Sequence, residues 1–283
     1  MDTGEISGRV RDGVVLGVTR GRAAVRQVAA RRVRPRRLGP ARENASFVGA
    51  VGLVAALAAV ALLDPGARDL VGGAGGGWRR FVSILTSFGQ GVEILVVSGV
   101  LLIACLALSP DGLSRQVRAG IVRLGWTAAF VFVAVAGSGL LASLAKNAFG
   151  RARPDHLAGG GIFEIHPLAF RADWAAFPSG HATTAGATAV VLALLAPRWR
   201  RPILAAGVVV AITRILLDAH FPSDVIAGVT LGASVTLALA HALGARGLVF
   251  AHDAAGRLVR RATPKGSGWT DVLAALIARA RRG

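Results

Sequence analysis

The chain has 283 residues, of which 53% are hydrophobic and only 17% are charged, and its mean hydropathy is +0.57. Soluble domains carry about 25% charged residues, so this composition disfavours an ordinary soluble domain and indicates long uncharged segments in a bilayer. The formal net charge of +18 would suit either a nucleic-acid-binding protein or an anionic membrane surface, and the positions of the basic residues decide between the two.

Six apolar stretches predict an all-α fold, a six-span transmembrane helical bundle. They are Ala45–Leu63, Val92–Leu108, Trp126–Ala145, His181–Ala196, Ile203–Leu217 and Val225–Leu243. Three of them are shorter than the roughly 20 residues that cross a hydrocarbon core, although polar residues at their ends can extend each helix into the interface. The alternative is a helical bundle buried inside a soluble protein, which six such runs disfavour.

Two further segments have the residue spacing of amphipathic helices. Between the first two spans, in a polar and Gly-rich segment, Trp78, Phe81, Ile84 and Leu85 predict a surface amphipathic helix on the outer side. In Trp269–Arg282 apolar residues recur at helical spacing among basic ones. This second pattern predicts a helix that rests on anionic lipids at the cytoplasmic face.

The basic residues mark one side of this topology. Of the 33 Lys and Arg residues, 25 fall before Ala45, in the loops Ser109–Gly125 and just after Ala196, or behind Leu243. Because Lys and Arg are enriched in cytoplasmic segments, both termini are predicted to be cytoplasmic, in the cell (inner) membrane. This placement also disfavours nucleic-acid binding, for which no recognisable module is present.

Three parts of the chain follow from these patterns. Residues 1–44 form a basic cytoplasmic N-terminal arm, which is expected to be mostly disordered. Residues 45–243 form the membrane domain, and residues 244–283 form a basic cytoplasmic tail with its amphipathic helix.

Three short segments on the outer side carry the candidate chemistry. Lys146 is followed, after six residues, by Arg153-Pro154. The fourth span opens with the run Pro178-Ser179-Gly180-His181. The fifth span ends in Thr213-Arg214, and His220 and Asp224 follow before the sixth span begins.

These residue types suit a phosphate site. Lys146, Arg153 and Arg214 can bind phosphoryl oxygens, arginine through its planar fork and lysine as a point charge. Ser179 and the amide of Gly180, at the start of a helix, add donors and the positive end of the helix dipole. The sequence contains no metal-ligand cluster, so we expect no metal and no other cofactor, and the cations must supply the charge stabilisation.

His220 and Asp224 have the form of an imidazole oriented by a carboxylate, which leaves the other ring nitrogen free to attack. His181 is then the second acid–base group. The remaining histidines are interpreted as structural: His156, His166, His241 and His252. Arg151 and Arg171 are interpreted as headgroup contacts or as surface-loop residues.

The three segments resemble the three-part signature of the type 2 phosphatidic acid phosphatase superfamily: K-x6-R-P, P-S-G-H and S-R-x5-H-x3-D. Every spacing is met, with Thr213 in place of the usual serine. The resemblance spans Ala45 to Leu243 and implies a six-span lipid phosphatase with an outward-facing site.

The resemblance also implies a role for each residue. His220 would attack phosphorus to give a phosphohistidine, Asp224 would orient it, and His181 would protonate the leaving oxygen and then activate water. Five residues would bind the phosphoryl oxygens: Lys146, Arg153, Ser179, Gly180 and Arg214.

The expected function is hydrolysis of a lipid phosphomonoester or diphosphate at the periplasmic or exterior membrane face. An alternative is a phosphotransferase of the same superfamily that passes the phosphoryl group to another lipid. A haloperoxidase-like vanadate site also fits the signature, but those relatives are soluble, so the six spans disfavour it.

The lipid itself and the oligomeric state are left open. Undecaprenyl diphosphate, phosphatidylglycerol phosphate, phosphatidic acid and lipid A phosphate would present the same terminal group. Selection among them is expected in the loop Asp155–Phe177, which contains three consecutive glycines.

Overall fold

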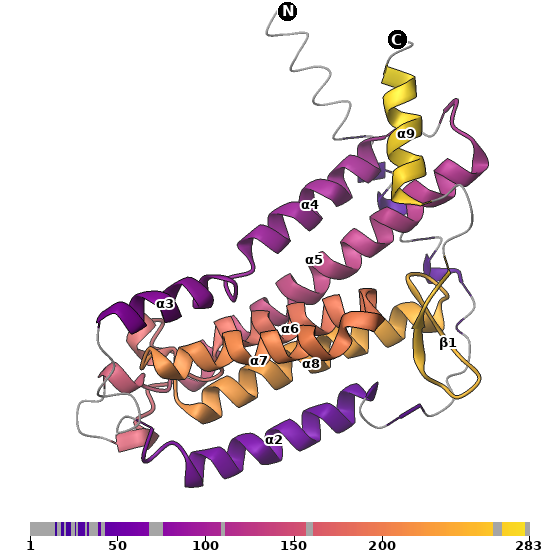
Figure 1. Ribbon diagram of the computed structural model, residues 1–283. Helices are drawn as coiled ribbons and strands as arrows, with labels where there is room; N and C mark the ends of the chain where they lie inside the picture. The colour runs from indigo at the N-terminus through magenta and orange to yellow at the C-terminus, as the bar shows by residue number, and fades with distance from the viewer. Residues whose placement is uncertain are drawn as a thin grey trace, which may run out of the picture.

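A computed structural model of the chain describes residues 43–67, 76–108, 111–156, 161–262 and 268–280, with scattered positions between residues 15 and 40. The basic N-terminal arm therefore falls largely outside the described residues. The main helices are α2 (Ala45–Leu62), α3 (Gly76–Ser87), α4 (Val92–Ala107), α5 (Arg115–Phe149), α6 (Gly180–Leu195), α7 (Arg200–Leu216), α8 (Pro222–Ala245) and α9 (Trp269–Ala280) (Figure 1). Single 3-10 turns lie at Pro154–His156, Gly161–Phe163, Ala172–Trp174 and Pro197–Trp199.

Among the described residues, four helical segments are long and apolar enough to cross a membrane: Ala45–Leu62, Gly76–Ala107, Arg115–Phe149 and Pro222–Ala245. The chain is thus a mostly helical, multi-pass membrane protein. Helices α6 and α7 coincide with the fourth and fifth predicted spans but have only 16 and 17 residues. They are about 24–26 Å long, shorter than the ~30 Å hydrocarbon core, and the count of six spans is not confirmed.

Helix α5 departs most from the predicted boundaries. It begins at Arg115 instead of Trp126, so most of the predicted loop Ser109–Gly125 is helical. Ser114 caps its first turn, and Gly150 ends it in the left-handed conformation. The arginines of this segment suggested a loop, but arginine is a good helix former. The 35 residues of α5 span about 50 Å, so the helix continues beyond a hydrocarbon core.

Helix α3 coincides with the predicted surface helix. Trp78, Phe81 and Ile84 are roughly half exposed, whereas Val82 and Thr86 are buried. The helix packs against α7, and a turn at residues 88–91 separates it from α4. The apolar side chains of Trp78, Phe81 and Ile84 therefore face away from the protein, where they can contact lipid in the membrane interface.

Helices α6 and α8 form the centre of the bundle. They run parallel, because α7, which lies between them in the sequence, runs in the opposite direction. Glycines let their backbones touch. A Cβ at Gly228 would lie 2.5 Å from the carbonyl oxygen of Ser179, and one at Gly232 would lie 2.1 Å from that of Thr183. Small residues at such a crossing allow the close packing on which membrane helices depend. The crossing fixes the first turns of α6 and α8 at the same end of the molecule.

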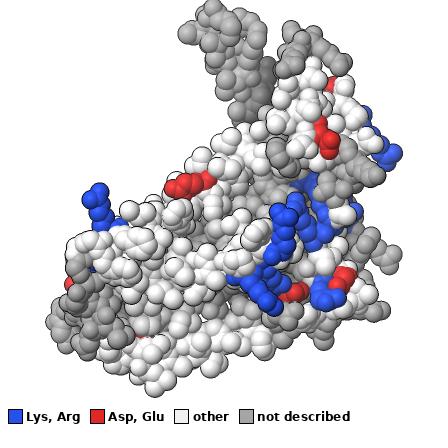
Figure 2. Space-filling view, in the orientation of Figure 1, with Lys and Arg blue, Asp and Glu red and all other residues white. Residues whose placement is uncertain are grey.

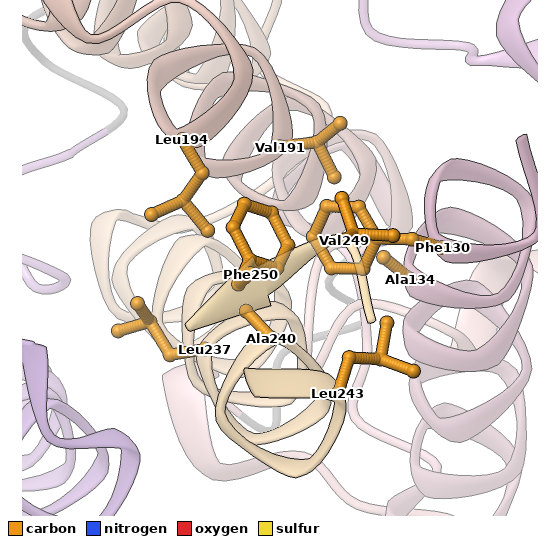
Figure 3. Close-up of a cluster of buried hydrophobic side chains, with 9 residues drawn as sticks. All are labelled: Phe130, Ala134, Val191, Leu194, Leu237, Ala240, Leu243, Val249 and Phe250. Atoms are coloured by element: carbon orange, nitrogen blue, oxygen red, sulfur yellow. The ribbon is translucent and has the colours of Figure 1, made fainter. Parts of the chain in front are cut away.

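The opposite end is closed by a hairpin that the sequence did not predict. Its strands, β1 (Phe250–His252) and β2 (Leu258–Arg260), are antiparallel and only three residues long. The hairpin packs into a buried cluster: Phe130, Ala134, Val191, Leu194, Leu237, Ala240, Leu243, Val249 and Phe250 (Figure 3). The rings of Phe130 and Phe250 meet edge to face with centroids 5.0 Å apart. The first part of the predicted tail is therefore anchored on α5, α6 and α8.

Candidate active site

The predicted site residues all lie at one end of the bundle, on the left in Figure 1, where α5 and α7 end and α6 and α8 begin. Lys146 is in the last turn of α5, and Arg214 is in the last turn of α7. Ser179 caps α6, and its backbone N–H donates to the carbonyl oxygen of Asp224 at 3.0 Å. Three segments that are far apart in the sequence thus form one site.

Three cations converge at this end. A Cβ at Gly180 would lie only 3.1 Å from the Nζ atom of Lys146, so the missing side chain leaves room for the ammonium beside the start of α6. The Nε atoms of Arg153 and Arg214 are buried, and neither has a hydrogen-bond partner in the part of the chain that the structure describes. The other end of the Arg214 guanidinium donates to Thr86 Oγ1 of α3 at 3.2 Å.

Buried donors without partners are costly, and so are buried cations without counter-charges. None of Lys146, Arg153 and Arg214 forms an ion pair with a carboxylate among the described residues. An oxyanion would satisfy both deficits at once. The arrangement therefore has the chemistry of an anion site with fixed donors.

The start of α6 adds donors of a different kind. Ser179 is fully buried, and its Oγ accepts from the N–H of Ala182 at 3.4 Å, which leaves the hydroxyl proton to donate elsewhere. The free backbone N–H groups of a first turn carry the positive end of the helix dipole and suit a bound phosphate.

His220 lies in the short connection before α8 and is only 3% exposed. Its Nδ1 is 2.9 Å from the carbonyl oxygen of Ala176. A carbonyl can only accept, so Nδ1 carries the proton and Nε2 has a free lone pair. Burial lowers the pKa of His220 below its ordinary value, and the opposing influence of Asp224 is smaller. His220 is therefore neutral at pH 7, which is the form that can attack phosphorus.

Asp224 contributes to this arrangement differently from the sequence interpretation. Its Oδ2 is 3.7 Å from His220 Nδ1, beyond hydrogen-bond distance. That oxygen instead accepts from the N–H of Phe221 at 2.9 Å, and Oδ1 accepts from Arg151 at 2.7 Å. His220 Nδ1 donates to the Ala176 carbonyl oxygen the direct hydrogen bond that orients the imidazole, and Asp224 supplies a negative charge at slightly longer range.

His181 is the second residue of α6 and is partly buried. The charges of Lys146, Arg153 and Arg214 and the ring of His220 all act on its imidazole electrostatically. The second predicted acid–base group thus lies within the same charged cluster as the predicted nucleophile.

The structure also reveals participants that the sequence interpretation missed. Arg151 is not a surface-loop residue: it is 6% exposed and pairs with Asp64 and Asp224. The signal was its position directly after a helix-ending glycine and two residues before Arg153. Arg171 does lie on the surface, in an exposed pair with Asp173.

Three of the remaining histidines pack against other rings. His241 and His252 stack on each other at the hairpin end, and His166 packs on Trp174 in the loop before α6. No group of three or more His, Cys, Asp or Glu side chains that could hold a metal occurs within the described ranges.

Several known proteins are similar to this chain. The model of the PAP2 superfamily matches residues 127–248, a range that contains every predicted site residue. Lipid A 1-phosphatases from Rhizobium etli and Rhizobium johnstonii are each 38% identical over 172 residues, which is 61% of this chain and 74% and 70% of theirs. The crystal structure of a PAP2 type phosphatidylglycerolphosphate phosphatase from Bacillus subtilis aligns over 79% of this chain and 94% of its own, with a TM-score of 0.41 and 17% identity.

Proposed function

The chain belongs to the PAP2 superfamily and is a phosphatase, and on that premise we propose that it removes a phosphate from a membrane lipid through a phosphohistidine intermediate. The observation that carries the proposal is a buried, neutral His220 beside cations that lack counter-charges among the described residues. An anion is the ligand that such a site lacks. A free imidazole nitrogen next to a bound phosphate is positioned for phosphoryl transfer.

The proposed reaction has two steps. First, Nε2 of His220 attacks phosphorus, so that an N–P bond forms while the P–O bond to the lipid breaks, and His181 gives its proton to the leaving oxygen. Lys146, Arg153 and Arg214 hold the non-bridging oxygens throughout. Second, His181 takes a proton from water, the water oxygen attacks phosphorus, and the N–P bond breaks. Inorganic phosphate then leaves, and both histidines return to their initial protonation states.

We propose a lipid A-like glycolipid phosphate as the substrate. The support comes from the Rhizobium relatives, whose names specify the 1-phosphate of lipid A. The cation cluster itself would accept the terminal phosphoryl group of many lipids. Discrimination is therefore assigned to the loop between α5 and α6, in which the carbonyl oxygens of Glu164 and Asp173 accept hydrogen bonds from the backbone of Ala152 and of the cation-cluster residue Arg153.

A lipid panel tests this function. Purified protein in detergent that contains EDTA is incubated separately with lipid A, phosphatidylglycerol phosphate, undecaprenyl diphosphate and phosphatidic acid. His220→Ala is the matched control. We expect inorganic phosphate release to be fastest with lipid A, together with loss of one phosphate from its mass. Faster turnover of another lipid would overturn the substrate assignment, and phosphate found on a second lipid would make the protein a phosphotransferase. A requirement for a divalent metal would contradict the mechanism.

The membrane placement is a further part of the proposal: six spans, both termini cytoplasmic, and the active site facing outward. Helix α6 is buried over most of its length, so its neighbours shield it from lipid despite its 16 residues. Lys and Arg side chains gather at the end of the molecule that carries the hairpin (Figure 2). A cavity of about 390 Å³ at that end is lined by Arg31, Arg118, Arg123 and Arg261, which supports contact with anionic lipids.

Reporter fusions test the placement. Fusions at Gly112 and after Gly244 should report the cytoplasm, and a fusion at Gly160 should report the outside. An outside signal at Gly112 would reverse the orientation.

A further inference from the structure

We propose that Arg151 and Asp64 form a buried positioning unit that holds Asp224 and the start of α8, and thereby supports the orientation of His220 that its hydrogen bond to Ala176 sets. The inference rests on the proposed phosphohistidine chemistry. Arg151 occupies a position that the signature motifs leave unspecified, and Asp64 lies before all three motifs in the sequence.

The guanidinium of Arg151 connects three segments. Its Nη1 donates to Asp224 Oδ1 at 2.7 Å and to Ser223 Oγ at 2.8 Å, and its Nη2 donates to Asp64 Oδ2 at 2.8 Å. Its Nε donates to the carbonyl oxygen of Ile162 at 3.2 Å. Its Cζ atom also lies over the ring of Phe221, 4.3 Å from the ring centroid. All three nitrogens are therefore committed to protein acceptors.

Asp64 follows the last turn of α2 and reaches across to α8. Its Oδ1 accepts from the backbone N–H of Ser223 at 3.0 Å, and its Oδ2 accepts from the Ser223 hydroxyl at 2.6 Å. The side chains of Asp64 and Asp224 are both fully buried, and that of Arg151 is 8% exposed. Helix α2 is thus joined to the first turn of α8 by charge-assisted hydrogen bonds that water does not weaken.

The unit matters to catalysis because of what Asp224 must do. A carboxylate 3.7 Å from His220 Nδ1 can stabilise the imidazole in its attacking orientation only if it stays ionised and does not move. Arg151 is the positive partner of both buried carboxylates, and without it two buried negative charges would lose the ion pairs that compensate their burial. Arg151 supplies the charge, and Asp64 fixes the position of the arginine.

Arg151 and Arg153 consequently have different tasks although only one residue separates them. The Nε atom of Arg153 has no partner among the described residues, so it is free to bind a phosphoryl oxygen. The Nε atom of Arg151 is occupied by Ile162. Arg151 is thus a positioning residue and not a phosphate ligand.

The two tasks predict different kinetic signatures. Arg151→Lys keeps the charge but loses the fork, so we expect kcat to fall by about 10–100-fold while KM and the inhibition constant for vanadate change less than about 3-fold. Arg153→Lys should raise the vanadate inhibition constant by at least about 10-fold, because vanadate occupies the phosphate position. Arg257→Lys, in an exposed pair with Asp253 at the hairpin end, is the matched control and should behave as wild type.

Two further variants complete the test. Ser223→Ala removes one bridging hydroxyl, keeps both ion pairs, and should lower kcat by about 3–10-fold even if Arg151→Lys fails to fold. Asp64→Asn should lower kcat alone, and combining it with Arg151→Lys should cost little more than the worse single variant, because the residues act as one unit.

The outcomes separate this inference from the proposed function. Wild-type protein that releases no phosphate from any lipid would refute the proposed function directly. If the wild type is active but Arg151→Lys raises the vanadate constant as much as Arg153→Lys, Arg151 is a phosphate ligand and the inference is wrong. Unchanged kcat in Ser223→Ala and Arg151→Lys would also overturn it.

Discussion

Two arginines at the active-site end of the bundle differ from two at the hairpin end in how their donors are used. At the active-site end, Arg153 and Arg214 each keep a buried Nε that has no partner within the described part of the chain. At the hairpin end, Arg123 donates to the carbonyl oxygens of Arg261 and Ala262, and Arg261 donates to that of Gly247. The position of a charge along the chain predicts its side of the membrane. Whether the donors of an arginine have protein partners distinguishes a residue that can bind an anion from one that holds a loop in place.

The largest expected effect tests the active-site end itself. His220→Ala should abolish turnover and the covalent phosphoenzyme, because the attacking nitrogen is lost. His181→Ala should lower turnover by about 10²–10⁴-fold, since both proton transfers lose their catalyst. Acid-labile, base-stable label trapped after a short incubation measures the intermediate.

A substrate with a good leaving group sharpens the distinction between the two histidines. It needs little protonation, so His181→Ala should still form the labelled intermediate and accumulate it. Label that persists in His220→Ala but disappears in His181→Ala would exchange the roles of nucleophile and acid.

The second prediction compares arginines from the two ends directly. Arg153→Gln and Arg214→Gln should each lower kcat/KM by about 10²–10³-fold, because each removes donors from the developing charge. Arg123→Gln should leave kcat/KM within about 2-fold of wild type, since its donors serve a loop at the other end. The measurement is kcat/KM for phosphate release from the preferred lipid, with all variants in the same detergent. A comparable loss in Arg123→Gln would show that the two ends do not differ in this way.

The third prediction follows from the lowered pKa of His220. The neutral form attacks, so a pKa below its ordinary value of about 6.5 extends activity to lower pH. The acid limb of kcat/KM should therefore have its midpoint below pH 6.5. Asp224→Asn removes an influence that raises the pKa, so it should move the midpoint to still lower pH. A midpoint above pH 6.5, or one that Asp224→Asn leaves unchanged, would show that the acid limb of kcat/KM reports the titration of a group other than His220.

Much of this fold could be predicted because a bilayer demands long apolar helices. The start of α2 and α4 agrees with the predicted spans to the residue, and α6 and α8 begin within three residues of them. The start of α5 could not be predicted from hydropathy, because a helix that leaves the membrane loses its apolar signal but keeps its backbone hydrogen bonds. The hairpin was missed because strands of three residues are too short to show a pattern of alternation.

The site divides in the same way. The motifs identified Lys146, Arg153, His181 and His220 as residues that should meet, since spans of alternating direction bring their ends together. Asp64 could not be identified, because its partners are 87 and 159 residues away along the chain. The Ala176 carbonyl could not be identified either, because a backbone acceptor has no signature in the sequence.

The smallest expected effect concerns the hairpin end and is one of stability. Arg123→Ala removes the donors that hold the carbonyl oxygens of Arg261 and Ala262, just after β2. Water can replace the lost donors at this exposed position, so the cost should be about 1 kcal/mol, equivalent to a fall of about 2–4 °C in Tm for a chain of this size. Arg118→Ala is the matched control, because Arg118 lies on the same helix and no hydrogen bond from its side chain occurs among the described residues. Melting both variants in one detergent at one scan rate should lower Tm only for Arg123→Ala, with phosphatase activity retained in both. An equal fall in Tm for Arg118→Ala would mean that the positive charge at this end stabilises the hairpin, and not the hydrogen bonds that Arg123 donates to Arg261 and Ala262.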